Sequence, residues 1–263
     1  MRIDGATVLL TGATGGIGRA LAHQLSEAGA CLVMTGRRAD ALEPLAAELG
    51  ARYVTADLGE RGDVARLADV CEDTDILVAN AAVPASGDLL EYTVDQVDRA
   101  LEVNLRAPVV LARLLAPRMV AVGRGHLAFV GSMSGKAATP LSSLYTASKF
   151  GLRGFAHSLR QDLRGAGVGV SLVQPGFVGE AGMFADTGAP VPGGLRTVSP
   201  EQVATAVVGA IRTGRAEVNI APWKLRLNCA LAGQFPGFTG RKQPEGEARN
   251  VAHRIVEAQR AAR

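Results

Sequence analysis

The feature of this sequence that most restricts its fold is the alternation of short apolar runs with helical patterns. Seven runs are typical of strands: Ala6–Thr11, Cys31–Thr35, Arg52–Ala56, Asp75–Ala79, His126–Gly131, Val168–Gln174 and Glu217–Ala221. Strands that alternate with helices usually form a parallel sheet covered by helices on both faces. The sequence therefore predicts an α/β protein with a doubly wound, seven-stranded, mainly parallel sheet.

A glycine-rich turn follows the first predicted strand and opens a helical segment that runs to about Ala28. The turn reads Thr11-Gly12-Ala13-Thr14-Gly15-Gly16-Ile17-Gly18. Glycines in this context let the backbone approach a pyrophosphate, and the free amides of the helix N-terminus bind the anion. We interpret the turn as the dinucleotide site of a Rossmann fold. The alternative is a glycine-rich connection without a ligand.

A second motif places Tyr145 and Lys149 four residues apart at the start of another helical pattern. Residues at this spacing are neighbours on a helix surface. A free tyrosine titrates near pH ~10, and a nearby cation lowers that pKa toward the range useful for acid–base chemistry. The pair therefore suggests a catalytic site. The alternative is an exposed tyrosine and lysine on an ordinary helix.

Taken together, the motifs resemble those of the short-chain dehydrogenase/reductase family over about residues 3–220. Beside the two motifs above, the chain has Asn80-Ala81-Ala82 after the fourth predicted strand, then Asn104, Ser132 and Pro175-Gly176 in the order of that family. It departs from the family at Ala82, where glycine is usual, and at Glu180. The family often has threonine at the latter position to hold the nicotinamide carboxamide.

The resemblance implies a role for each matching side chain in the chemistry. Tyr145 is expected to be the general acid in reduction and the general base in oxidation. Lys149 is expected to lower the tyrosine pKa and to bind the nicotinamide ribose, while Asn104 positions a water in a proton relay. Ser132 is expected to hold the substrate oxygen. These roles agree with the chemistry, because hydride transfer to a carbonyl builds negative charge on its oxygen.

The motifs and the resemblance together give a set of expected cofactor contacts: Gly12, Thr14, Gly16, Ile17, Gly18, Arg37, Arg38, Asp57, Asn80, Tyr145, Lys149, Pro175, Gly176 and Val178. Asp57 is expected either to bind the adenine amino group or to cap a helix. Asn80 is expected mainly to tie backbone groups of the sheet together.

The end of the second predicted strand indicates which dinucleotide is bound. NAD-selecting sites place an acid there for the ribose 2′-hydroxyl, whereas this chain has Gly36 followed by two arginines. A guanidinium forms paired, charge-assisted hydrogen bonds with a phosphate. We expect Arg37 to contact the 2′-phosphate and Arg38 to support it, so that NADP(H) is preferred and NAD(H) is the alternative. Two solvated arginines are the other interpretation.

The length of 263 residues and the 48% hydrophobic content suit a single α/β domain. We expect residues 1–222 to form the dinucleotide-binding and catalytic part and residues 223–263 to extend it. Apolar residues at 223, 227, 231 and 235 form a helical row flanked by Lys224, Arg226, Arg241 and Lys242. This extension is expected to be a lid or a subunit contact, with membrane contact less favoured. A helix packed on its own domain is the remaining alternative.

Composition excludes several classes of function. The net charge of +3 comes from the tail, where eight Lys and Arg face three Glu from Lys224 onward, so nucleic-acid binding is not indicated. No apolar run is long enough to span a membrane, and the three cysteines are widely separated, which favours a cytoplasmic protein. The four histidines share no ligand spacing, and no metal is expected.

These observations favour an NADP(H)-dependent oxidoreductase that interconverts a carbonyl and a secondary alcohol. Phe177, Met183 and Phe184 suggest an apolar substrate. The alternatives are an NAD-dependent alcohol dehydrogenase of the same fold and a non-catalytic nucleotide-sensing protein. A homodimer or homotetramer is expected through the helices that begin near Asn104 and Tyr145. We also expect a mobile loop over residues 179–198, followed by a helix with Ser199 as N-cap and Pro200 in its first turn.

Overall fold

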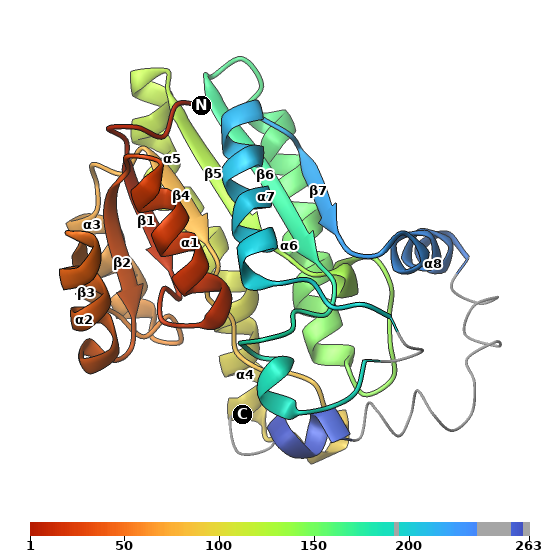
Figure 1. Ribbon diagram of the computed structural model, residues 1–263. Helices are drawn as coiled ribbons and strands as arrows, with labels where there is room; N and C mark the ends of the chain where they lie inside the picture. The colour runs from red at the N-terminus through yellow and green to blue at the C-terminus, as the bar shows by residue number, and fades with distance from the viewer. Residues whose placement is uncertain (192–194, 236–253, 260–263) are drawn as a thin grey trace.

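The computed structural model describes residues 1–191, 195–235 and 254–259, and its centre is one seven-stranded sheet (Figure 1). All six neighbouring strand pairs are parallel. The strand order is β3-β2-β1-β4-β5-β6-β7. The strands are β1 Thr7–Thr11, β2 Cys31–Gly36, β3 Arg52–Thr55, β4 Ile76–Ala79, β5 Gly125–Val130, β6 Val168–Pro175 and β7 Glu217–Ile220.

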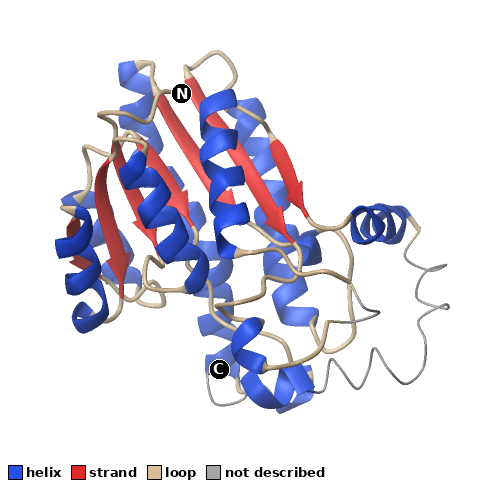
Figure 2. Cartoon of the chain, in the orientation of Figure 1, coloured by secondary structure: helices blue, strands red, loops and turns tan. Residues whose placement is uncertain are grey.

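Helices cover both faces of the sheet, as Figure 2 shows. The α-helices are α1 Gly16–Glu27, α2 Ala39–Leu49, α3 Arg61–Val70, α4 Val94–Leu101, α5 Ala107–Val122, α6 Ser143–Asp162, α7 Pro200–Thr213 and α8 Trp223–Gln234. A π-helical turn, η2 Glu102–Arg106, joins α4 to α5. The short 3-10 turns are η1 Leu89–Glu91, η3 Met133–Gly135 and η4 Ala185–Thr187. The predicted doubly wound Rossmann architecture is confirmed.

The two faces of the sheet have separate cores, because successive side chains of a strand point to opposite sides. In β1, Val8 and Leu10 pack with α1, α2 and α7, whereas Leu9 packs with α3, α5 and α6. All three residues are fully buried. Burial on both faces explains why the strands are nearly continuous apolar runs instead of alternating patterns.

Each observed strand begins and ends within one residue of its predicted bounds. The predicted start of α7 is also confirmed: the Ser199 hydroxyl accepts a hydrogen bond from the Gln202 amide at 3.2 Å, and the Gln202 side chain accepts one from the Ser199 amide. The loop predicted over residues 179–198 contains η4 and ends at a parallel bridge between Val178 and Val198.

The strand order reverses direction next to β1, which lies between β2 and β4. Ligands of such sheets bind in the crevice at the carboxyl ends of the strands, where the order reverses. Asn80, directly after β4, links the ends of β4 and β1 as expected. Its side chain donates to the carbonyls of Thr11 and Gly12 at 3.1 and 3.2 Å. Within the described residues, no helix is long and apolar enough to cross a membrane.

Candidate active site

A cleft of about 700 Å³ runs along the carboxyl ends of the strands. The glycine turn forms one part of its wall, and the segments that follow β2, β3, β4, β5 and β6 form the rest together with residues of the C-terminal extension. Of the predicted site residues, all except Arg38 and Asn104 line this cleft.

Helix α6 brings Tyr145 and Lys149 to the cleft on one face, as predicted. Lys149 is 3% exposed, and its Nζ donates to the carbonyl of Val130 at 3.2 Å. That carbonyl is the last of β5, so the lysine ties the helix to the strand that precedes Ser132. Lys149 Nζ lies 5.7 Å from the centre of the Tyr145 ring.

The surroundings of Tyr145 shift its pKa. Burial raises the pKa of the Tyr145 hydroxyl above its ordinary value, and a hydrogen bond with Ser132 only partly opposes this. Burial also lowers the pKa of Lys149 to about 8. In this structure the net shift of the tyrosine pKa is upward, and the lowering expected from Lys149 stays a prediction. The net shift is upward because withdrawal of the phenol from water outweighs the opposing hydrogen bond.

Ser132 lies two residues after the end of β5 and is the N-cap of the turn η3. Its Oγ accepts a hydrogen bond from the amide of Ser134 at 3.1 Å, which fixes the side chain. The Ser132 hydroxyl also forms a hydrogen bond with the Tyr145 hydroxyl, and both groups line the cleft. Two hydroxyl groups from different elements thus converge on one point of the cleft, where they can bind a single oxygen atom.

Asn104 lies behind the cleft wall, in the π-helical turn between α4 and α5. It is 1% exposed, its Oδ1 accepts from the amide of Val83 at 2.8 Å, and its Nδ2 donates to the carbonyl of Val83 at 3.0 Å. Both polar groups of the side chain are therefore used to hold Val83, which lines the cleft.

The glycine turn fits a dinucleotide. A Cβ at Gly12 would lie 2.8 Å from Ala81, and one at Gly16 would lie 2.8 Å from Ala181, so the backbone packs more closely than side chains would allow. Helix α1 begins here without a side-chain cap or an acidic residue in its first turn. Its free amides and positive dipole end therefore suit a pyrophosphate.

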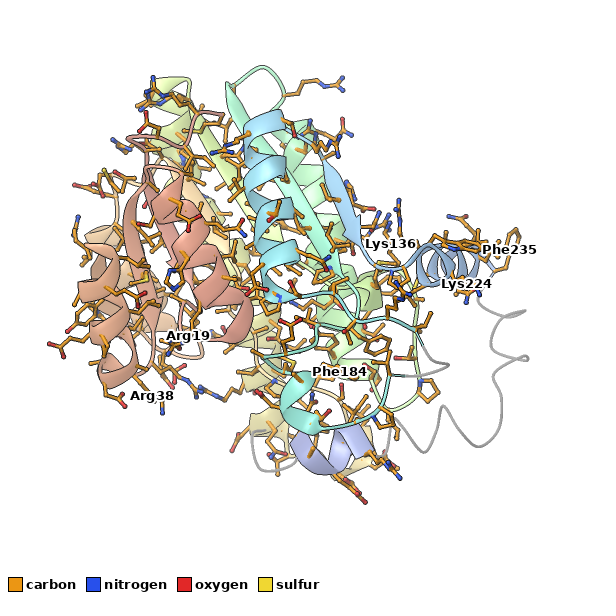
Figure 3. The ribbon with its side chains drawn as sticks, viewed as in Figure 1. Arg19, Arg38, Lys136, Phe184, Lys224 and Phe235 are labelled. Carbon is orange, nitrogen blue, oxygen red and sulfur yellow. The ribbon has the colours of Figure 1, made fainter. Side chains whose placement is uncertain are left out.

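The two arginines after β2 differ in position. Arg37 lines the cleft, whereas Arg38 does not: its side chain is 72% exposed and lies 4.0 Å from Asp40. Figure 3 shows Arg38 at the periphery of the molecule beside α2. The expected support of a phosphate by Arg38 is not seen in this arrangement, because the side chain points to solvent.

Asp57 lines the cleft after β3 but is already engaged by protein groups. Its carboxylate accepts two hydrogen bonds from Arg99 at 2.9 and 3.0 Å and one from the amide of Gly59 at 2.9 Å. Burial raises the pKa of Asp57, but these hydrogen bonds outweigh it and hold the pKa below its usual value. The alternative that Asp57 caps the next helix is wrong, because the N-cap of α3 is Glu60.

The segment after β6 completes the cofactor side of the cleft. Pro175, Gly176 and Val178 line the cleft as expected. Glu180 does not: it is exposed and has a left-handed backbone, with φ of 67°. A contact between this position and a nicotinamide carboxamide is therefore not provided by the Glu180 side chain.

Comparison with known proteins agrees with this geometry. The family model for short chain dehydrogenase matches residues 6–190, which is more than half of the chain. The chain belongs to the short-chain dehydrogenase/reductase family. It is therefore an oxidoreductase enzyme, as the names of its relatives also indicate.

Two curated relatives of this family cover most of the chain. One is 1-deoxy-11-beta-hydroxypentalenate dehydrogenase of Streptomyces exfoliatus, which is 40% identical over 82% of this chain and 82% of its own. Another is ketoacyl reductase HetN of a Nostoc species, 33% identical over 82% of this chain and 78% of its own. Among solved structures, a metagenomic short-chain oxidoreductase in complex with NADP is 30% identical, with a TM-score of 0.71 over 84% of this chain and 99% of its own.

In this short-chain dehydrogenase/reductase, sequence reasoning missed several residues of the cleft wall. Leu225 and Cys229 of α8, and Ile255 and Gln259 near the C-terminus, line the cleft. Their segment was expected to be a lid or subunit contact, but no local pattern singled out these four side chains. Arg241 and Lys242, which were expected to flank the extension, lie outside the described residues.

Proposed function

We propose that this enzyme interconverts a carbonyl and a secondary alcohol with NADP(H), and that its substrate is largely apolar. The observation that carries the proposal is the convergence of the Ser132 and Tyr145 hydroxyls in one cleft, with the Lys149 side chain buried behind them.

The proposed roles follow from where charge develops. When bound, NADP(H) supplies or accepts the hydride. During reduction the Ser132 hydroxyl donates a hydrogen bond to the substrate oxygen as that oxygen becomes negative, and Tyr145 transfers its proton to it. In the reverse direction Tyr145 receives the proton of the alcohol. Lys149 places a positive charge near the phenol, and Asn104 holds Val83 in the cleft wall.

Two observations support NADP(H) over NAD(H). Gly36 leaves no acid at the end of β2, and Arg37 lines the cleft next to it. A guanidinium in this place suits a 2′-phosphate, while an acid would repel it. The solved relative with NADP has the same fold at 30% identity.

An apolar substrate is supported by the wall beyond Ser132. Apolar side chains that line the cleft include Val83, Met133, Phe177, Met183, Phe184, Leu195 and Leu225. The rings of Phe177 and Phe184 contact each other with centroids 4.8 Å apart. Side chains of this kind bind substrates mainly through apolar contacts and less through charge. The C-terminal extension contributes to this wall, which supports its proposed role as a lid.

The test is a screen of ketones and secondary alcohols of increasing size with NADPH, NADH and their oxidised forms. The absorbance of the reduced nicotinamide reports turnover, and Tyr145→Phe serves as the matched inactive control. We expect turnover of apolar ketones with NADPH. Faster turnover with NADH than with NADPH would contradict the proposed cofactor. Equal activity in wild type and Tyr145→Phe would contradict the proposed mechanism. The proposal includes a cytoplasmic location, which the free thiols of Cys31, Cys71 and Cys229 favour.

A further inference from the structure

The helical residues 254–259 contribute a buried carboxamide to the wall of the cleft. Gln259 is 6% exposed and lines the cleft together with Ile255, one turn earlier on the same face. In Figure 1 this helical turn lies beside the segment that contains η4. Figure 3 places Phe184, at the start of that segment, above the turn.

One end of this carboxamide has a partner and the other does not. Gln259 Nε2 donates to the carbonyl of Met183 at 3.3 Å, which sets the orientation of the amide. Gln259 Oε1 is buried and, in the part of the chain that the structure describes, has no hydrogen-bond partner. A buried acceptor that has lost its water without gaining a donor is destabilising, and most such groups in proteins are paired.

We propose that Gln259 Oε1 accepts a hydrogen bond from a hydroxyl or N–H group of the substrate, at a distance from the reacting carbonyl. This inference rests on the proposed function and narrows it. The substrate class is then a neutral, mainly apolar ketone or alcohol that carries one remote hydrogen-bond donor.

The charges along the cleft support a neutral donor. The charged residues that line it are Arg37, Asp57 and Arg99, at the ends of β2 and β3 and on α4, and Lys149 beside the catalytic tyrosine. The residues placed next to Gln259 are Met183, whose carbonyl accepts its hydrogen bond, and Ile255 on the same helical turn, and neither side chain is charged. No described cation there would bind a carboxylate or phosphate, whereas the amide oxygen can accept one hydrogen bond from an uncharged group.

The test compares straight-chain methyl ketones of increasing length, each with and without a terminal hydroxyl. At the best length we expect the wild-type enzyme to favour the hydroxylated ketone by about 10- to 100-fold in kcat/KM, because the unsubstituted ketone leaves the acceptor unpaired. Gln259→Met keeps the side-chain length but removes the amide, and the preference should fall to about 1. Ile255→Val trims the same wall without a polar change and should affect both ketones equally.

Equal preference in wild type and Gln259→Met, or a wild-type preference for the unsubstituted ketone at every length, would overturn the inference. A purely structural role of Gln259 would lower kcat/KM for both ketones alike and would leave their ratio unchanged. Gln259→Leu provides a second variant if the Met variant melts at a lower temperature than wild type.

Failure of the proposed function has a different signature. If neither cofactor supports turnover of any ketone, calorimetry still measures the dissociation constants of the paired ketones. Tighter binding of the hydroxylated ketone by wild type, lost in Gln259→Met, would support the site without the reaction. Equal dissociation constants in both proteins would overturn it.

Discussion

Burial shifts the pKa values of Tyr145 and Lys149 in opposite directions. It raises the pKa of Tyr145 and lowers that of Lys149 to about 8, because burial disfavours the charged form of each group, although Lys149 still carries its charge at neutral pH. At neutral pH the tyrosine therefore carries its proton, as a general acid for reduction requires. Alcohol oxidation needs the proton to leave and should become faster as pH rises.

Tyr145→Phe removes the hydroxyl but keeps the ring. We predict that the variant folds and binds NADPH but loses about 10²- to 10⁴-fold in turnover, the usual effect of removing a general acid. Initial rates and a fluorescence titration with NADPH measure the two properties separately. Near-normal turnover of a substrate used by wild type would exclude Tyr145 as the acid.

Lys149→Met tests the cost of the buried charge. Because burial lowers the folded-state pKa from 10.5 to about 8, the lysine contributes favourably only as the neutral amine, above about pH 10.5. That contribution is lost as pH falls to about 8. We therefore predict that the variant is inactive yet more stable than wild type at pH ~7, by about 1–2 kcal/mol after loss of the bond to Val130.

Urea denaturation at neutral and alkaline pH checks this prediction. The stability difference should shrink as pH approaches the ordinary lysine pKa. A variant that is less stable than wild type at neutral pH would show that the charged lysine stabilises the fold.

Arg37→Ala and Gly36→Asp test the cofactor preference. A Cβ at Gly36 would lie 3.7 Å from its nearest neighbours, so aspartate fits there without displacing the backbone. We predict that each variant raises the KM for NADPH by about tenfold or more, with a much smaller change for NADH. Arg38→Ala is the matched control, because this exposed side chain lies outside the cleft.

The measurement is steady-state kinetics with both cofactors. Equal shifts for NADPH and NADH in the Arg37 and Gly36 variants would assign the 2′-phosphate to other residues. An effect of Arg38→Ala as large as that of Arg37→Ala would show that the exposed arginine moves to the cofactor.

At the scale of elements, β5 and β6 share a buried polar contact. His126 Nε2 lies 2.9 Å from Ser171 Oγ, and burial lowers the pKa of His126 to about 4. The Ser171 hydroxyl in turn donates to the carbonyl of Arg215, so the neutral imidazole donates to the serine. Protonation of His126 would place a positive charge between the two strands, where no water can solvate it.

We predict that this histidine makes the protein sensitive to acid. Its folded-state pKa is below the ordinary 6.5, so its contribution is complete above pH 6.5 and is lost as pH falls toward 4. The loss is on the order of 3 kcal/mol. Denaturation across this range should show a flatter pH dependence in His126→Gln than in wild type. The half-exposed His23 on α1 offers a control, since His23→Gln should leave the profile unchanged.

The same elements show what the sequence can and cannot predict. The strands were predicted to within one residue because the five inner ones are buried apolar runs that end near a glycine or polar turn, and the half-exposed edge strands β3 and β7 are bounded by similar turns. Ser132, Tyr145 and the glycine turn were found because their spacing is local. In contrast, the partners Arg99 of Asp57, Val83 of Asn104 and Met183 of Gln259 join residues 42, 21 and 76 positions apart. Only the folded chain brings these groups together.

At the scale of the whole molecule, α5 and α6 leave part of their surface open. Phe150 is 40% exposed and is accompanied on α6 by exposed Ala147, Gly151 and Gly154, which leave a flat surface. We predict a homodimer or homotetramer formed through this face. Phe150→Glu should weaken association by about tenfold or more, because it places a charge in an apolar contact.

Light scattering across micromolar concentrations measures the mass of both proteins. An exposed apolar row on α8, which includes Trp223 and Leu227, offers the competing interface. Leu227→Glu is therefore the control and should leave the mass unchanged. Dissociation by Leu227→Glu alone would move the interface to α8, and a wild-type monomer at all concentrations would contradict the prediction.

The position of β1 between β2 and β4 has a consequence for synthesis on the ribosome. The hydrogen bonds between Thr11 and Asn80 span 69 positions, so β1 emerges long before the strand that covers its second edge. Parallel pairing of this kind forms slowly because distant segments must meet first. During translation the edge of β1 is therefore unpaired until β4 has left the exit tunnel.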